Sequence, residues 1–230
     1  MLIPKHIGFI MDGNGRWANQ RGLIRSKSHS EGLKHILKVL DICHNIGIEI
    51  VSAYVWSTEN WGRPSVEVHA LMKSIQFFGP HLANELHNRQ VRIIHSGSRQ
   101  RLSKATLKVI DDALELTKDN GSRVFNLAFN YGGRAELVQC VRQLIAQKIS
   151  PEAITETTVT EYLYTNELPD IDLVIRTGGE KRISNYFLWQ SAHAWLYFTE
   201  TYWPELSRHD IEEAIKSYNR GSRQNQGRMV

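Results

Sequence analysis

The sequence predicts an α/β fold, a single domain built on a mostly parallel six-stranded sheet flanked by helices. Two observations support this. Short apolar runs alternate with longer segments whose apolar residues recur at helical spacing, and glycines punctuate the joins between them. Such alternation is typical of parallel sheets, because each strand must return to the same edge through a crossover connection. A chain of 230 residues, 41% of them hydrophobic, can bury one medium-sized core.

The expected elements follow from these patterns. The predicted strands are 7–11, 49–55, 91–95, 123–129, 171–175 and, from a weaker pattern, 194–198. The predicted helices are 30–45, 65–88, 103–118, 133–147 and 209–219. The Pro-containing stretch 149–151 is expected to be a loop between helices. Neither a repeat nor a linker divides the chain, so we expect one domain over residues 1–230 with a flexible tail from about residue 220.

Composition narrows the class of protein. The net charge of +4 fits an anionic substrate or a peripheral membrane contact, and it lacks the clustered basic stripe of a nucleic-acid binder. Cys43 and Cys140 stand alone in the sequence, which indicates buried thiols in a reducing compartment. A signal peptide and an apolar run of membrane-spanning length are both missing from the sequence, so we expect a cytoplasmic protein.

The segment 6–17 is the most informative part of the chain. It reads His-Ile-Gly-Phe-Ile-Met-Asp-Gly-Asn-Gly-Arg-Trp, an apolar run that ends in a carboxylate, two glycines and an arginine. Asp12 can hold a divalent cation, and Arg16 follows about one helical turn later and can face the same anion. A helix that begins at these glycines directs its positive end toward that anion. The pattern indicates a magnesium–diphosphate site, although such turns also occur as simple punctuation.

Polar segments follow several of the predicted strands in the same way. They are 57–60, 130–134 and 176–180. Open α/β sheets bind their ligands in a crevice outside the carboxyl ends of the strands. The repetition therefore favours one binding site at that edge of the sheet.

A second basic cluster comprises Arg176, Arg182 and Ser184. Two guanidinium groups can hold a diphosphate, and the hydroxyl adds a donor. Exposed arginines are often merely solvated, but these two flank paired glycines after a buried strand, and this context favours a function. Together with Asp12 and Arg16, the cluster predicts two neighbouring anion sites.

Three further features have two interpretations each. Arg21, Arg25 and His29 recur at four-residue spacing, so one helix face would present either a cationic wall or a solvated surface. Trp61, between Asn60 and Arg63, either covers a site or packs its own loop. Apolar faces on 65–88 and 103–118 could line a hydrocarbon tunnel, although such stripes are more often ordinary core. The residues of these faces are Val68, Leu71, Met72, Ile75, Leu107, Ile110 and Leu114.

Together, these motifs resemble those of the cis-prenyltransferases, the undecaprenyl diphosphate synthase family. The resemblance is carried by 6–18, 57–64, 130–134 and 172–185, and it continues through 188–190, 197–199 and 203–204. It runs from about residue 5 to residue 220 in the order typical of the family, and the combination is highly specific.

The resemblance implies a homodimer with a hydrophobic tunnel. It also implies magnesium-dependent condensation of isopentenyl diphosphate onto dimethylallyl, geranyl or farnesyl diphosphate. By motif position, Asp12 would help hold Mg²⁺ and assist ionisation, and Asn60 would lie near the reacting carbons. The allylic diphosphate would be bound by Gly13, Asn14, Gly15, Arg16, Trp17, Arg25, His29, Ser57 and Arg63. Isopentenyl diphosphate, or a second diphosphate, would be held by Arg176, Arg182 and Ser184.

Several departures from the family pattern concern diphosphate or metal binding. Trp195 replaces a glutamate that takes part in binding magnesium, Ser28 replaces a glycine, and the arginine-rich ending is altered over 220–227. Val55 and Trp56 stand where the family commonly has alanine and phenylalanine, and would narrow the tunnel. We therefore expect a specialised enzyme that makes a short product or couples two allylic units irregularly, with or without cyclisation.

Other functions stay open at this stage. A conventional long-chain polyprenyl diphosphate synthase would need Glu180, Glu200 or substrate oxygens in place of the missing carboxylate. A non-catalytic prenyl-binding subunit is disfavoured because the motif residues are present in register. A nucleotide-binding protein is disfavoured further, because no element that reads a base or ribose accompanies the glycines.

Overall fold

The structure, a computed structural model, describes residues 2–23 and 25–226, with residues 25–30 and 222–226 described by their backbone alone. One sheet of six strands forms its centre, in the order β3-β4-β2-β1-β5-β6. Every neighbouring pair is parallel, so the predicted fold class is confirmed. The strands are β1 (His6–Ile10), β2 (Ile50–Ser57), β3 (Val91–Ser96), β4 (Arg123–Tyr131), β5 (Leu173–Arg176) and β6 (Trp195–Phe198).

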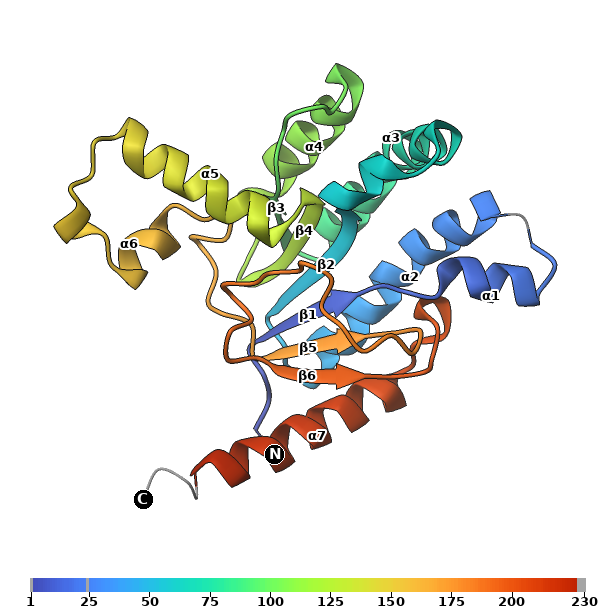
Figure 1. Ribbon diagram of the computed structural model, residues 1–230. Helices are drawn as coiled ribbons and strands as arrows, with labels where there is room; N and C mark the ends of the chain where they lie inside the picture. Colours follow the sequence, from blue (N-terminus) through green and yellow to red (C-terminus); the bar gives the residue numbers. More distant parts are fainter. Residues whose placement is uncertain (1, 24, 227–230) are drawn as a thin grey trace.

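The helices connect successive strands and pack on the sheet (Figure 1). They are α1 (Asn14–Gln20), α2 (Arg25–Ile46), α3 (Ser65–Asn88), α4 (Lys104–Thr117), α5 (Gly133–Ala146), α6 (Glu156–Glu161) and α7 (Arg208–Gln226). Short 3₁₀ turns lie at η1 (Thr58–Gly62), η2 (Pro151–Ala153) and η3 (Trp203–Glu205). All six predicted strands and all five helices predicted by periodicity are present, with boundaries shifted by a few residues.

Two core layers enclose the sheet. Along one face, α7 contacts α2, α2 contacts α3, and α3 contacts α4. Ile7 and Phe9 of β1 point into this layer, whereas Ile10 points to the opposite face and packs with Tyr186 and Phe187. This division follows from the two-residue period of a strand. Figure 1 shows α7 beside β6 at one end of the sheet. The helices α5 and α6 extend away from the sheet (Figure 1).

Three local features differ from the sequence-based expectation. The helix α6 was not predicted, because its six residues include a single apolar one and so offer no apolar periodicity. The helix expected over 209–219 continues to Gln226, into the segment for which a flexible tail is expected. Arg21 ends α1 and the left-handed Gly22 follows, so Arg21 does not share a helix with Arg25. The predicted continuous cationic face is therefore wrong, because the chain turns between these residues.

In the part of the chain that the structure describes, no helix is both long enough and apolar enough to cross a membrane.

A row of buried, hydrogen-bonded polar side chains crosses the sheet, away from the edge at which its strands end. His6 is 1% exposed, with Nδ1 2.8 Å from the Pro169 carbonyl and Nε2 2.7 Å from the Ser52 hydroxyl. Because a carbonyl can only accept, Nδ1 carries the hydrogen and Nε2 accepts from Ser52. Ser52 in turn accepts from Asn126 at 2.9 Å. These bonds satisfy a histidine that is held neutral.

This histidine makes the fold sensitive to acid. Burial lowers the pKa of His6 from 6.5 to about 4. Between these two values the unfolded chain binds the proton and the folded chain does not, so stability is complete above pH 6.5 and falls as the pH is lowered toward 4. We expect His6 to contribute a loss of about 3 kcal/mol in the free energy of unfolding over this interval.

Urea unfolding at several pH values tests this expectation. His6→Gln should show a shallower loss of stability between pH 6.5 and 4 than the native chain does. The exposed His193 provides the matched control, because His193→Gln should keep the native pH dependence. A His6→Gln curve parallel to the native one would contradict the assignment.

Candidate active site

The carboxyl ends of β1, β2 and β5 bring the polar segments together at one edge of the sheet. Ile10 at the end of β1 is level with Arg176 at the end of β5, and Asp12 follows two residues later. The strand β2 lies on the other side of β1 and leads directly into η1, which contains Asn60. The crevice predicted from the sequence therefore exists, because parallel strands end on the same side.

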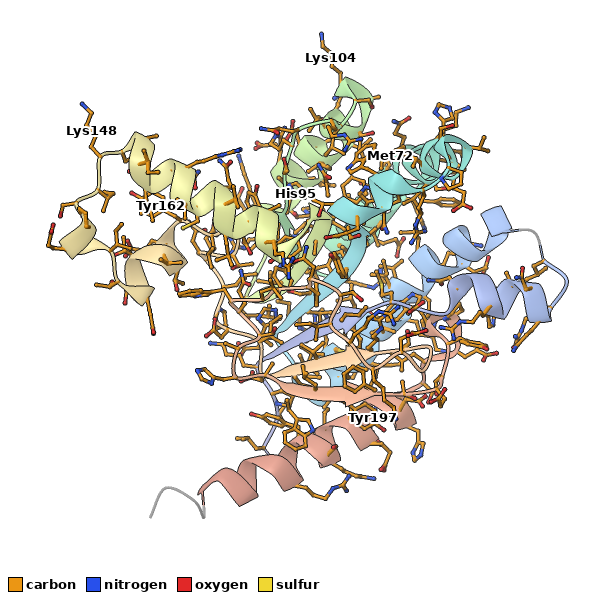
Figure 2. The ribbon with its side chains drawn as sticks, in the orientation of Figure 1. Met72, His95, Lys104, Lys148, Tyr162 and Tyr197 are labelled. Atoms are coloured by element: carbon orange, nitrogen blue, oxygen red, sulfur yellow. The ribbon has the colours of Figure 1, made fainter. Side chains whose placement is uncertain are left out.

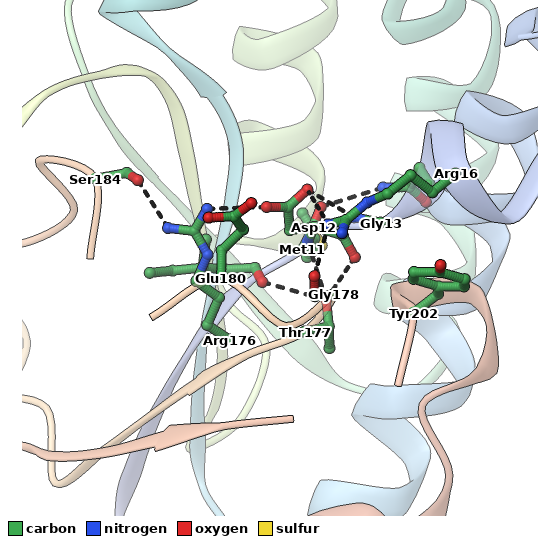
Figure 3. A network of polar contacts seen from close by, with 12 residues as sticks. Met11, Asp12, Gly13, Arg16, Arg176, Thr177, Gly178, Glu180, Ser184 and Tyr202 are labelled. Carbon is green, nitrogen blue, oxygen red and sulfur yellow. Dashed lines mark hydrogen bonds and ion pairs between the residues drawn. The ribbon is translucent and has the colours of Figure 1, made fainter. Parts of the chain in front are cut away.

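Asp12 lies at the centre of a polar network (Figure 3). Its Oδ2 accepts from Nη2 of Arg176 at 2.9 Å, and its Oδ1 accepts from the backbone N–H of Gly13 at 2.7 Å. Nη2 of Arg16 lies 3.7 Å from Oδ1 and donates to the Gly178 carbonyl at 2.6 Å. Two arginines thus hold the carboxylate from different sides, and its side chain is still 35% exposed. An exposed, oriented carboxylate flanked by cations suits the binding of a metal-bound anion.

Arg176 connects the two predicted anion sites. Its side chain is 5% exposed, and besides Asp12 it reaches the Ser184 hydroxyl, 2.7 Å from Nη1, and the Arg182 carbonyl, 2.5 Å from Nη1. Its Nε is buried and has no partner among the described residues. Arg176 therefore orients Asp12 rather than standing free in the cleft, and the two sites are joined by one guanidinium group.

The backbone around Asp12 is fixed by a residue that sequence reasoning missed. The Thr177 hydroxyl accepts from the Asp12 N–H at 2.9 Å and donates to the Asp12 carbonyl at 2.7 Å. Gly13 has φ 96°, and a Cβ there would lie 2.5 Å from the Tyr202 ring. Glycine is required for both reasons, the left-handed backbone and the close approach. Neither Thr177 nor Tyr202 has a signal of its own in the sequence, because each acts through distant contacts.

A cleft of about 540 Å³ opens beside Asp12, within the range of small-molecule sites. Seven residues predicted for the site line it: Asp12, Gly13, Asn14, Gly15, Arg16, Asn60 and Arg63. Six lining residues were not predicted as ligands: Met11, Asn19, Tyr54, Val55, Trp56 and Leu71. The glycine-rich turn and η1 therefore face each other across one space, and apolar side chains form part of its wall.

Two asparagines in this wall have well-defined partners. Asn14 donates through Nδ2 to the Met11 carbonyl at 3.1 Å, while its Oδ1 is buried without a partner among the described residues. Asn60 accepts at Oδ1 from the Ser57 N–H at 3.1 Å, in a capping box that Ser57 completes. Ser57 thus shapes the turn that holds Asn60, whereas the unpaired oxygen of Asn14 is packed against Gly32 of α2, where a Cβ would lie 2.7 Å from it.

Other predicted ligands lie outside this cleft. The Trp17 indole N–H donates to Glu205 at 3.2 Å, and Arg21 pairs with the same carboxylate and covers the Trp17 ring. These contacts join α1 to η3, so the structure does not bring Trp17 into the cleft. The side chains of Arg25 and His29, and that of Ser28, lie outside the described residues.

The Ser184 region is shaped by left-handed backbone. Ser184 and Asn185 have φ 50° and 63°, and Asn185 donates to Glu59 at 2.6 Å. Burial acts to raise the pKa of Glu59, but hydrogen bonds from Asn185 and neighbouring groups outweigh it and lower the pKa. Arg182 is exposed and pairs with Glu180. The loop is therefore tied to η1 through Asn185. The side chain of Arg182 lies at the surface of the loop.

Trp195 does not face Asp12 within the chain. It begins β6 level with Leu173, three residues before the level of Arg176, which is about 10 Å along a strand. Its indole N–H donates to Ser217 of α7 at 3.1 Å, and its ring packs so closely on Gly221 that a Cβ there would collide with it. Within one chain Trp195 therefore anchors α7, and its interpretation as the replacement of a metal ligand stays a prediction.

Apolar side chains continue inward from the cleft. Trp56 is 2% exposed and packs with Leu71, Ile75 and Ile110, with the Trp61 ring edge-on at 5.7 Å. Beyond this cluster, an apolar cavity of about 50 Å³ lies between α2, α3, α4 and the sheet. Of the seven predicted tunnel residues, Ile75 and Ile110 line this cavity, Leu71 lines the polar cleft, and Val68 and Met72 line a separate pocket. Leu107 and Leu114 pack on the Trp56 cluster.

The fold and site define an open parallel α/β protein with an anion-binding crevice at the carboxyl ends of its strands. Comparison with known proteins identifies the family. The sequence model described as "Putative undecaprenyl diphosphate synthase" matches residues 10–226. The chain belongs to this family of prenyltransferases, as the resemblance predicted.

Individual relatives agree with the family assignment. An isoprenyl transferase of Fusobacterium nucleatum is 46% identical over 96% of this chain and 95% of its own length. An isoprenyl transferase of Clostridium perfringens is 43% identical over 96% of this chain and 89% of its own length. Lavandulyl diphosphate synthase from Lavandula x intermedia, solved with dimethylallyl diphosphate, has a TM-score of 0.89 at 31% identity, covering 94% of this chain and 95% of its own. A probable undecaprenyl diphosphate synthase from Campylobacter jejuni has a TM-score of 0.80 at 30% identity, covering 95% of this chain and 96% of its own.

Proposed function

We propose that this protein transfers prenyl groups between isoprenoid diphosphates, with loss of diphosphate from an allylic substrate. The single observation that carries the proposal is the Asp12–Arg176–Ser184 connection, whose Asp12 lines a cleft of about 540 Å³. It joins two anion sites, as the coupling of two diphosphates requires. Family membership and the dimethylallyl diphosphate bound to the lavandulyl synthase support the substrate class.

The residues present fit a magnesium ion carried by the substrate. Mg²⁺ is usually held by one or two carboxylates together with phosphate oxygens and water, and Asp12 offers one exposed carboxylate. The described residues include no cluster of three side chains that could bind a metal alone. Asp12 would hold the ion, which would neutralise charge that develops on the departing diphosphate.

The protein groups supply charge stabilisation and exclusion of water. Arg16 and the first N–H groups of α1 face the position of the allylic diphosphate, where oriented donors are most effective. Arg182 and Ser184 would bind the second diphosphate. Tyr54, Val55 and Trp56 form the apolar side of the cleft and shield an allylic cation from water.

We further propose that the product is short. Trp56 lines the polar cleft and packs with Ile75 and Ile110, which line the apolar cavity, so its indole stands between the two spaces. The cavity of about 50 Å³ is far below the several hundred Å³ typical of ligand sites. A growing chain would have to displace this indole, which is 2% exposed, from the core. The proposal thus rests on Trp56 rather than on Trp195.

Product analysis tests the proposed activity. The purified protein and Mg²⁺ are incubated with isopentenyl diphosphate and each allylic diphosphate, and with each allylic diphosphate alone. Products are then identified by mass spectrometry after dephosphorylation. A short product supports both proposals, and formation from allylic diphosphate alone would indicate irregular coupling. A long regular ladder would support prenyl transfer and overturn the short-product proposal. No product with any substrate, despite binding, would favour a non-catalytic prenyl-binding subunit.

Trp56→Ala is expected to lengthen the product. Removing the indole joins the cleft to the apolar cavity, because the side chain occupies the space between them. The change also costs about 3–5 kcal/mol of stability, so a Trp56→Phe variant provides a milder second test. Trp189→Phe, in a separate core cluster, is the matched control. An unchanged product distribution in both Trp56 variants would contradict this role.

The homodimer implied by the resemblance is part of the proposal. Light scattering on the purified protein in solution measures its mass directly, and a mass of twice 26.4 kDa is expected.

A further inference from the structure

A second pocket lies beside the cleft and is lined by cations. It has a volume of about 470 Å³ and lies between η1, α3 and the start of α4. Arg63, Lys73 and Arg101 line it together with His69, and no carboxylate is part of its lining. Figure 2 marks Met72 of α3, another of its lining residues, and Lys104, the first residue of α4.

The cations of this pocket have no counter-charge among the residues that the structure describes. Arg63, Lys73 and Arg101 form no ion pair with any residue in the described part of the chain. Arg99, two residues before Arg101, pairs with Asp111 at 2.8 Å and does not line the pocket. These three side chains are exposed, and like charges around one hollow focus a positive potential that attracts an anion into it. The unpaired set therefore points to an anionic ligand.

Buried groups hold these cations in place. Asn130 is 3% exposed and donates to the Ser98 and Gln100 carbonyls at 2.7 and 2.8 Å, which fixes the loop before Arg101. Asn130 also accepts from the Trp61 indole N–H at 2.7 Å. Arg101 lies over the Trp61 ring, 4.6 Å from its centroid, with a left-handed φ of 66°. The loop and the aromatic platform are thus tied to one residue in the core.

The remaining lining suits phosphate oxygens and a short apolar group. Ser65 provides a hydroxyl donor, and the first turn of α4 contains no acidic residue. The amide of Gln76 donates to Thr106 at 3.0 Å and holds α3 against the start of α4. Val68 and Met72 provide an apolar side. Arg63 lines both this pocket and the catalytic cleft, so a ligand here competes with the cleft for one guanidinium group.

We propose that this pocket is a third diphosphate-binding site, distinct from the Asp12 cleft and from the Arg182–Ser184 region. The choice of diphosphate rests on the proposed prenyl transfer, which releases that anion. The ligand is either free inorganic diphosphate or the diphosphate end of a short prenyl diphosphate. Its occupancy withdraws Arg63 from the cleft and lowers turnover.

Calorimetric titration without turnover tests the site. A Lys73→Gln/Arg101→Gln variant is expected to bind one inorganic diphosphate per chain fewer than the native protein, or to bind it at least about tenfold more weakly. Arg99→Gln, in the same loop, should bind as the native protein does. Equal stoichiometry and affinity in the native and double-variant proteins would overturn the proposal, as would an equal response to sulfate at matched ionic strength.

Two further measurements keep the outcome decisive. If the double variant unfolds at a lower temperature than the native chain, the single Lys73→Gln and Arg101→Gln variants must each weaken the same site. Saturation with dimethylallyl thiolodiphosphate, an analogue of the prenyl diphosphate, identifies the source of the ligand. If inorganic diphosphate still binds the pocket in its presence, the ligand is the free anion. If the analogue itself occupies the pocket, the ligand is the prenyl diphosphate. If the native protein binds diphosphate at this pocket yet makes no prenyl product, prenyl transfer is refuted and the assignment of the pocket still holds.

Discussion

Replacing Asp12 by asparagine is expected to lower kcat/KM by about a thousandfold or more. The amide keeps one oxygen, which can still accept from Gly13 or from Arg176 but not from both, because the two donors use different oxygens of the carboxylate. The negative charge that would hold Mg²⁺ beside the departing diphosphate is lost, and removal of one such electrostatic group typically costs two to three orders of magnitude. Initial rates at several Mg²⁺ concentrations measure the effect.

The matched control for Asp12 is Asp112→Asn. Asp112 is a surface carboxylate on α4 that pairs with Lys108, remote from the cleft. This variant should keep native rates. Asp12→Asn should also keep a melting temperature close to the native one, which separates a loss of chemistry from a loss of fold. A rate within tenfold of native in a folded Asp12→Asn protein would show that Asp12 does not hold the metal.

Arg176→Lys is expected to lower kcat/KM by about a hundredfold. An ammonium group cannot reach Asp12, Ser184 and the Arg182 carbonyl together, because it lacks the planar fork of the guanidinium group. Asp12 would lose its orientation, and the link between the two anion sites would break. Arg176→Met, which removes the charge, should in addition lower the free energy of unfolding by about 3 kcal/mol.

The exposed Arg182 is the control for the stability part of this prediction. Its pair with Glu180 lies at the surface, so Arg182→Met should change the free energy of unfolding by less than about 1 kcal/mol. Urea unfolding of both methionine variants gives the comparison. Equal stability of the Arg176→Met and native proteins would show that the buried contacts of Arg176 do not support the fold.

Much of the fold was predictable because the signals for strands and long helices are local. The buried strands β1, β2 and β4 are apolar runs, and α3 has its predicted bounds because Pro64 precedes it and its apolar residues keep helical spacing. The helix α6 was missed because its sequence has no such spacing. The face proposed for Arg21 and Arg25 was wrong because Gly22 ends α1 there.

The candidate site was predicted in its composition but not in its connections. Asp12, Arg16 and Asn60 meet in one cleft because each follows a parallel strand, as the strand order implies. That Arg176 bonds to Asp12, and that Thr177 fixes the Asp12 backbone, depends on contacts across more than 160 residues of chain. No spacing in the sequence encodes such contacts.

The sequence by itself determined the alternating order of strands and helices, the polar segments after the strands, and the family to which they belong. These are properties of short segments, set by side-chain periodicity and by the residue types a turn requires. Tertiary structure alone decided that Trp195 anchors α7, that Trp56 is buried in the wall of the cleft, and that Arg63 is shared between two pockets. The physical reason is that direction and burial of a side chain depend on what packs against it, which the residue itself does not specify.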